Sequence, residues 1–374
     1  MYNMGYPFFV IAPVFALFGD SLPALRVANA LLGVSATYLC YLVAKEAGAG
    51  RNGQLLAACA WAFYIPSSVY TVYAFKENLL TPVMLAALWC ALRFVKEARL
   101  GVAVVCGILF GLIALCGNAG LAVALPVIMV LAPTFMKALH NRRAIVSIGL
   151  VAALVTTPWL MRNMAVLGEP VLNTNGGFNF YLGNNENATG EFISIADTPM
   201  GDKWQGLLNL NEAHASNVLK AEAHKWIAAH PDQFAVLAVK KLILFWTPPY
   251  HDGKGPQSTK EKLARTVWLV QFLLLATGAA GTLFLRHGTR QQNKVLWCAI
   301  VAYTALHMLV YVMPRYREPI MPVVCILAAV FAERMFAAWP ALKHRYAGRP
   351  QQVTETGYPG SGVTNVALLE KLDE

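Results

Sequence analysis

The sequence contains few charged residues. Only 13% of its 374 residues are Asp, Glu, Lys or Arg, whereas about a quarter of a typical soluble globular protein is charged. Hydrophobic residues make up 57% of the chain, and the mean hydropathy is +0.49. The alternating apolar and polar segments of a membrane β-barrel are also lacking. These features exclude a soluble globular protein and favour a helical membrane protein.

Common cofactor signatures are missing as well. The sequence has no Walker A motif, no dinucleotide fingerprint and no internal repeat. Its seven cysteines lie in apolar segments without a CxxC pair, so we interpret them as small buried apolar residues. His214, His224 and His230 are spaced by ten and six residues, which differs from helical metal-ligand spacing. We interpret these histidines as solvated, and the patterns predict no metal and no cofactor.

Long apolar runs indicate membrane-spanning helices. A helix needs roughly 18 or more apolar residues to cross a bilayer, and only helices or closed barrels satisfy the backbone there. We therefore predict an all-α polytopic membrane protein. The run at 6–18 is too short to span and is either the remnant of a span or an interfacial helix. The predicted spans are 24–44, 54–73, 78–95, 101–116, 119–136, 144–161, 264–285, 295–313 and 320–338.

The positions of Lys and Arg predict the orientation. With these spans, every short loop rich in Lys or Arg falls on one side, which the positive-inside bias makes cytoplasmic. This distribution explains the net charge of +10 without nucleic acid. The segment 163–262 contains no Arg, eight Lys and ten Asp or Glu, so we place it on the opposite side. We expect an integral protein of a bacterial inner membrane with a cytoplasmic C-terminus.

The chain divides into four predicted regions. The external one contains a helix at 209–231, with Asn209 as its cap and Glu212 three residues on. Residues 234–247 are too short for a span and carry Lys240 and Lys241, so an interfacial amphipathic helix fits them better. The regions are an N-terminal transmembrane bundle (1–161), an extracytoplasmic segment (162–263), C-terminal transmembrane helices (264–339) and a mobile cytoplasmic tail (340–374).

An Asn- and Gly-rich stretch, TNGGFNFYLGNNENATG, occupies residues 174–190 and follows PWLMRN at 158–163. Asn amides both donate and accept hydrogen bonds, and aromatic rings offer flat faces, as a sugar or head-group site requires. Asn and Gly also favour tight turns, so a well-turned loop is an equal interpretation. The candidate cavity residues are Arg162, Asn163, Asn175, Asn179, Asn184 and Asn185.

Two short motifs place charge at the outer membrane face. PRYREP at 314–319 carries Arg315, Tyr316 and Arg317 on the side where the positive-inside bias disfavours arginine. Arg is well suited to bidentate phosphate binding, although snorkelling or an ion pair within the motif is the alternative. Lys76 and Glu77 lie between two apolar helices. Lys76 either meets a lipid phosphate or snorkels, and Glu77 either orients a substrate or caps the following helix.

The ordered set of motifs resembles the polyprenyl-phosphate-sugar-dependent GT-C glycosyltransferases, especially the dolichyl-phosphate-mannose–protein mannosyltransferase-like and aminoarabinose-transferase-like families. The resemblance implies a GT-C-like helix bundle that transfers a sugar from a lipid-phosphate donor to a lipid, protein or glycan acceptor outside the cytoplasm. It implies that Lys76, Arg315, Tyr316 and Arg317 approach the lipid phosphate, and some relatives use a divalent cation. The matching segments are GYP (5–7), LFGDSLPALRVANALLG (17–33), KEN (76–78), PWLMRN (158–163), residues 174–190 and RYREPIMP (315–322).

Members of these families carry a further transmembrane helix before GYP, and the resemblance implies that an acidic loop residue after it is the catalytic base. This chain begins four residues before Gly5. We therefore expect a chain truncated at its start, an inactive relative, or an enzyme that uses another carboxylate such as Glu77. A transporter or flippase of lipid-linked sugars is the rival, but charges at the outer interface favour a transferase.

Overall fold

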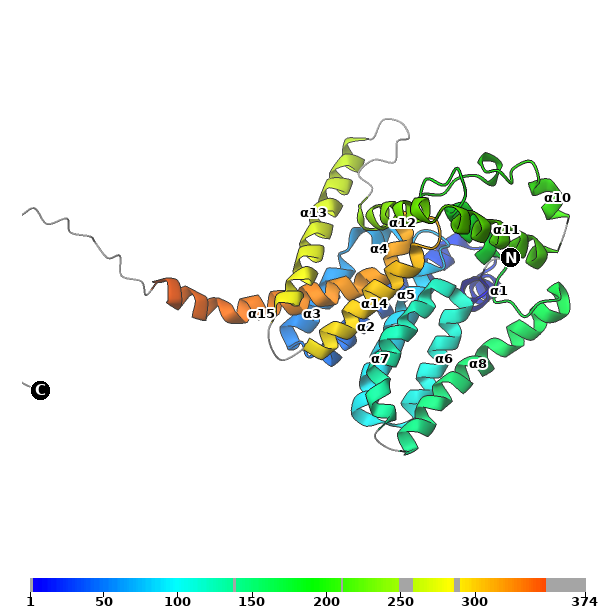
Figure 1. Ribbon diagram of the computed structural model, residues 1–374. Helices are drawn as coiled ribbons and strands as arrows, with labels where there is room; N and C mark the ends of the chain where they lie inside the picture. Colours follow the sequence, from blue (N-terminus) through cyan, green and yellow to red (C-terminus); the bar gives the residue numbers. More distant parts are fainter. Residues whose placement is uncertain (1–2, 137–138, 210, 249–257, 286–289, 348–374) are drawn as a thin grey trace, which may run out of the picture. The chain divides into compact units, whose positions relative to one another are not determined.

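A computed structural model describes residues 3–136, 139–209, 211–248, 258–285 and 290–347 (Figure 1). Residues Met1–Arg334 form one compact unit and Met335–Glu374 a second. All regular structure in the described ranges is helical, and only an isolated bridge joins Glu191 to Val312. The predicted all-α fold is therefore confirmed. The predicted tail at 340–374 lies mostly outside the described residues.

Five of the nine predicted spans coincide with helices that could cross a membrane, but the one predicted at 295–313 is not among those in the described residues, and the helix there ends at His307. Five helices are long and apolar enough to cross a membrane, at 22–46, 77–97, 141–167, 259–284 and 314–338, which confirms an integral membrane protein. Shorter apolar helices lie at 100–116 and 119–133. The larger α-helices are α1 (Ala12–Phe18), α2 (Leu22–Glu46), α3 (Arg51–Ala62), α4 (Ile65–Tyr70), α5 (Glu77–Glu97), α6 (Leu100–Cys116), α7 (Ala124–Phe135), α8 (Leu139–Leu167), α9 (Asn175–Gly183), α10 (Trp204–Leu208), α11 (Glu212–Ala229), α12 (Pro231–Trp246), α13 (Thr259–Gly281), α14 (Arg290–His307) and α15 (Met321–Ala347).

The prediction of one span at 54–73 is wrong, because the chain breaks between α3 and α4. Pro66 lies in the first turn of α4, where its missing N–H removes no helical hydrogen bond. In the interior of one long helix the same ring would clash with the preceding turn. Gln271 of α13 satisfies the broken backbone: its Oε1 accepts from Ile65 N–H at 3.1 Å, and its Nε2 donates to the Phe63 carbonyl at 2.7 Å.

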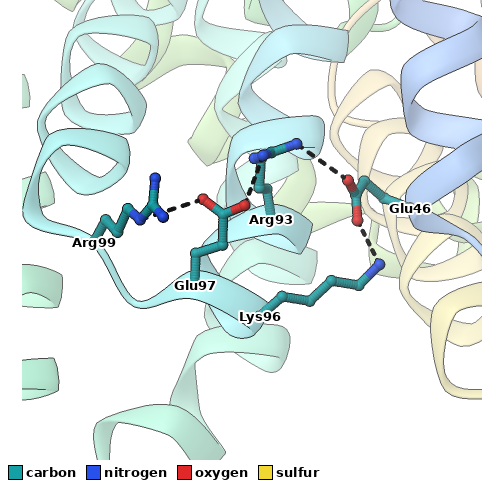
Figure 2. A network of polar contacts seen from close by, with 5 residues as sticks. All are labelled: Glu46, Arg93, Lys96, Glu97 and Arg99. Atoms are coloured by element: carbon teal, nitrogen blue, oxygen red, sulfur yellow. Dashed lines mark hydrogen bonds and ion pairs between the residues drawn. The ribbon is translucent and has the colours of Figure 1, made fainter.

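Helix α5 lies at the centre of the main core and contacts α2, α6 and α7. In its apolar window 67% of the residues are buried, against 11% in α8 at the lipid-facing edge. Figure 2 shows how the end of α5 is tied to the end of α2. Glu46 on α2 pairs with Lys96 at 2.5 Å and Arg93 at 3.8 Å, and Arg93 also pairs with Glu97 at 2.6 Å. Glu46 and Glu97 thus compensate part of the positive charge that Arg93 and Lys96 carry at the end of α5.

The short apolar run at the N-terminus is helical but does not reach the length of a span. It forms a π-helical turn (Pro7–Ile11) followed by α1, which together leave Phe8, Phe9 and Phe18 exposed. A short helix with exposed aromatic side chains is typical of a membrane interface, so the interfacial alternative describes this run better than a spanning helix.

The prediction that Asn209 caps the helix at 209–231 is wrong. The cap of α11 is Asn211 rather than Asn209, because extended Asn211 directly precedes the helix and its Oδ1 accepts from Ala213 N–H at 2.8 Å. Helix α12 does expose apolar side chains such as Val236 and Ile243, as an interfacial helix should. Its two lysines do not both face outward, however: Lys240 is exposed, but Lys241 is completely buried.

Candidate functional site

A polar cavity of about 530 Å³ lies where α5, α9, α11 and the end of α14 meet. Five of the predicted site residues line it: Lys76, Glu77, Asn175, Asn179 and Tyr316. They come from three segments separated by about a hundred residues or more, so the tertiary fold brings these motifs to one place. The cavity is the candidate functional site.

Lys76 is the charged residue among the predicted phosphate ligands that lines the cavity, and within the described residues it forms no hydrogen bond or ion pair. It occupies the N-cap position of α5 and lines the cavity opposite Gly117. A Cβ at Gly117 would lie 3.3 Å from Lys76 Nζ, so glycine leaves room for the ammonium. Burial lowers the pKa of Lys76, and the neighbouring Glu77 opposes this change. An anion in the cavity would stabilise the charged ammonium.

Glu77 begins α5 and is 4% exposed. It lines the polar cavity and also a smaller one of about 260 Å³ between α2, α4 and α5. Glu318 lines the smaller cavity too, and its buried Oε1 has no hydrogen-bond partner in the described structure. Glu77 is therefore a carboxylate that separates two polar cavities and reaches the one that contains Lys76.

The PRYREP motif forms a 3-10 helix (Pro314–Ile320) whose three predicted ligands point to different places. Tyr316 lines the cavity, and its hydroxyl donates to the Tyr311 hydroxyl at 3.2 Å. The Arg315 guanidinium lies 4.7 Å from the Phe75 ring centroid, and its buried Nε has no partner within the described residues. Arg317 is 2% exposed and donates to the Phe245 carbonyl at 2.7 Å. The structure thus brings Tyr316 into the cavity, but Arg317 faces α12 instead.

Four other predicted cavity residues do not line the cavity. Asn163 is fully buried, accepts from Arg162 Nη1 at 2.9 Å and donates to the Val171 carbonyl at 2.6 Å. Asn184 and Asn185 are buried at the end of α9 and donate to backbone carbonyls. Their short amides bond within the fold, so these residues shape the wall without facing the cavity. The well-turned loop is nevertheless wrong for most of the Asn- and Gly-rich stretch, because residues 175–183 form helix α9.

Helix α11 supplies a wall of the cavity that the motifs did not predict. Ser216, Asn217, Lys220 and His224 line it, and their spacing places them on one helical face. The His224 ring lies 5.0 Å from that of Phe180, which also lines the cavity. His224 is exposed, as a solvated residue should be, but it belongs to the site. The polar i, i+4 spacing along 216–224 was the available signal.

An apolar cavity of about 720 Å³ lies between α6, α7 and α8. Side chains such as Phe110, Leu131 and Ile148 line it, and the 61% exposed Ile128 marks its open side. Its lining includes Leu172, which directly follows Val171 of the polar cavity. One segment of chain therefore borders both a polar and an apolar cavity, and such a pair of neighbouring cavities suits an amphiphilic ligand.

Comparisons with known proteins agree with this architecture. Residues 6–161 match the family model described as dolichyl-phosphate-mannose-protein mannosyltransferase. The structure is similar to the archaeal oligosaccharyltransferase AglB from Archaeoglobus fulgidus, solved with an inhibitory peptide and a dolichol-phosphate, with a TM-score of 0.51 and 14% identity. The similarity covers 94% of this chain and 44% of AglB. The fold of this chain is thus similar to that of AglB.

This chain spans less than half the length of AglB. ArnT from Cupriavidus metallidurans, bound to undecaprenyl phosphate, also matches, with a TM-score of 0.41 and 17% identity over 92% of this chain and 71% of that chain. No curated protein matches the sequence. The GT-C resemblance predicted from the motifs is confirmed at the level of the fold.

The divalent cation that the resemblance implies does not fit the side chains of the cavity. Within the described ranges, no three His, Cys, Asp or Glu side chains gather into a possible metal site. Glu77 is the single carboxylate among the described residues that line the polar cavity. One carboxylate is a poor ligand set for Mg²⁺ or Ca²⁺, so the described lining of the cavity does not fit such an ion.

Proposed function

We propose that this protein is a membrane glycosyltransferase that takes a sugar from a polyprenyl-phosphate donor. The observation that carries the proposal is that the segment Val171–Leu172 borders both the polar cavity, which Lys76 lines, and the apolar cavity between α6, α7 and α8. A lipid-phosphate sugar has this division into an apolar chain, an anionic phosphate and a polar sugar. The acceptor class, whether lipid, protein or glycan, stays open.

In this proposal Lys76 binds the donor phosphate, because an ammonium next to a phosphate forms a charge-assisted hydrogen bond. Arg315 lies close enough to influence the pKa of Lys76 and adds positive charge at this end of the cavity. Asn175, Asn179 and Tyr316 then bind sugar hydroxyls. Tyr311 supports them, since its hydroxyl accepts from Tyr316 and lies 3.5 Å from Asn179 Oδ1.

Sugar transfer requires a base for the acceptor hydroxyl, and Glu77 is the candidate. The hydroxyl oxygen attacks the anomeric carbon while its proton passes to the Glu77 carboxylate. The bond from the anomeric carbon to the phosphate oxygen breaks at the same time, and the polyprenyl phosphate leaves with the electron pair. Lys76 stabilises the negative charge that develops on the phosphate. Direct displacement of this kind inverts the anomeric configuration.

The proposal includes the orientation and the division of the chain. In this proposal the cavity lies on the non-cytoplasmic side and the C-terminus in the cytoplasm of a bacterial inner membrane, and the basic loops support this orientation. The bundle 1–161 and the helices 264–339 then hold the lipid, the external segment 162–263 closes the cavity, and 340–374 is the cytoplasmic tail. Cysteine labelling of intact cells at an added external Cys, such as Lys225→Cys, tests this side.

The decisive experiment measures lipid-phosphate binding and sugar transfer separately. The full chain in detergent should bind undecaprenyl phosphate, and undecaprenol, which lacks the phosphate, should bind at least about tenfold more weakly if the charge-assisted bond contributes 1.4 kcal/mol or more. With a polyprenyl-phosphate sugar and membrane acceptors, wild type should release polyprenyl phosphate and Glu77→Gln should not. Equal binding of the two lipids would refute the donor class. Binding without cleavage, together with lipid movement across vesicles, would instead indicate a transporter.

A further inference from the structure

Lys241 is a buried cation outside the residues assigned to catalysis. It lies on α12 with no exposed surface. Its Nζ donates to Asn184 Oδ1 at 3.0 Å and to the Met308 carbonyl at 3.2 Å. Burying a charge is costly unless hydrogen bonds compensate it. A lysine at such a position is therefore a poor choice for filling space alone.

The two acceptors of Lys241 belong to two walls of the polar cavity. Asn184 ends α9, the helix that presents Asn175 and Asn179 to the cavity. Met308 directly follows α14 and precedes Leu309 and Val310, which line the opposite part of the cavity. Its carbonyl is among those at a helix C-terminus that lack an intrahelical partner, and a cation there is stabilised by the helix dipole.

Asn184 connects the same walls a second time. Its Nδ2 donates to the Phe180 carbonyl at 2.8 Å and to the Leu309 carbonyl at 2.7 Å. Gly183 next to it packs against the backbone of Val310 and Tyr311, where a Cβ would lie 2.5 Å from the Tyr311 nitrogen. The Asn184 amide and the Lys241 ammonium thus join the two walls at the point where their backbones come closest.

We propose that Lys241 is a positioning residue for the donor site: through Asn184 and the Met308 carbonyl it fixes the spacing between α9 and the segment that follows α14. This inference rests on the proposed function, because it assigns the cavity to the lipid-phosphate donor. Lys241 itself touches no substrate in this scheme. Its removal lets the two walls separate and misplaces Asn175 and Asn179 relative to Lys76.

The chain offers a matched control one residue away. Lys240 is on the same helix, has the same charge and is exposed. We expect Lys241→Met to weaken undecaprenyl phosphate binding roughly tenfold, equivalent to about 1.4 kcal/mol, and Lys240→Met to leave it unchanged. Lys241→Arg should recover much of the affinity, because a guanidinium can donate to both acceptors. Thermal unfolding in detergent shows whether each variant is folded.

Coupling to Asn184 separates positioning from a general loss of packing. If Lys241 acts through Asn184, the two substitutions should not add. The double variant Lys241→Met/Asn184→Ala should then bind undecaprenyl phosphate with the affinity of whichever single variant binds it less tightly. If Lys241→Met does not fold, Lys241→Gln, which keeps a donor group, replaces it in the cycle. A folded Lys241 variant with wild-type affinity, or equal losses for Lys240→Met and Lys241→Met, would overturn the inference. Failure of wild type to bind undecaprenyl phosphate would instead refute the proposed function.

Discussion

Glu333 Oε1 accepts a hydrogen bond of 2.8 Å from the backbone N–H of Gly53, which lies 280 residues earlier in the sequence. The second oxygen of Glu333 accepts from Gly50 N–H at 2.9 Å. Both donors belong to the start of α3, which has no side-chain cap of its own. A carboxylate from α15 therefore caps α3 and opposes the positive end of its dipole.

This contact predicts that Glu333 stabilises the bundle. Glu333→Ala removes two charge-assisted hydrogen bonds and leaves two N–H groups without their acceptor, so we expect a loss of about 2 kcal/mol in unfolding free energy. Thermal unfolding of the detergent-solubilised protein measures it. Glu222→Ala is the control, since Glu222 pairs with an exposed Lys225 and surface pairs contribute little. Equal stability of the Glu333 and Glu222 variants would contradict the capping role.

The contact between α6 and α8 depends on the absence of a side chain at Gly107. A Cβ there would lie 2.7 Å from the Ile148 carbonyl oxygen and 2.8 Å from Val151 Cβ. Small residues allow this close approach of membrane helices. Gly107→Leu should therefore push α8 away and cost about 1–3 kcal/mol. A Cβ at Gly101 on the same helix would meet no atom within 4 Å, so Gly101→Leu should be neutral in the same unfolding assay.

Lys76 should dominate recognition of the donor phosphate. Lys76→Met removes the ammonium that lines the cavity, and losing a charge-assisted hydrogen bond of about 1.5–3 kcal/mol corresponds to roughly a 10- to 100-fold weaker affinity. Binding of undecaprenyl phosphate measures the change. Lys225→Met on α11 is the control, because Lys225 lies outside the cavity lining. We also expect that undecaprenol binding is insensitive to Lys76→Met; a parallel loss for both lipids would mean that Lys76 supports the cavity instead of the phosphate.

Much of the fold could be predicted because lipid imposes simple rules on composition. Apolar length located α2, α5, α8, α13 and α15. Apolar length also predicted one span where the structure has α3 and α4. Hydropathy averaged over a window does not detect Pro66 or the break in the helix, which the Gln271 hydrogen bonds stabilise. Short helices such as α6 and α7 were found from their turns and not from their length.

The site was only half predictable for a different reason. Residue type suggested which segments are polar, and this selected Lys76, Glu77 and Tyr316, which line the polar cavity. It did not indicate where each side chain points, so Arg317 and Asn184 were grouped with them although both bond to the backbone. The contribution of α11 and the burial of Lys241 depend on contacts between segments far apart in the sequence, which a single sequence does not reveal.

The burial of Lys241 makes stability depend on pH above neutrality. Burial lowers the pKa of Lys241 from 10.5 to about 8, so between these values the unfolded chain binds more protons than the native one. Unfolding free energy therefore rises with pH from about 8 to 10.5, and below pH 8 the buried charge costs the native state about 3 kcal/mol. Thermal midpoints measured across this range should rise more steeply in wild type and Lys240→Met than in Lys241→Met. Identical slopes in all three proteins would show that Lys241 is not the group that titrates, because Lys240 is exposed and its variant removes the same charge from the same helix.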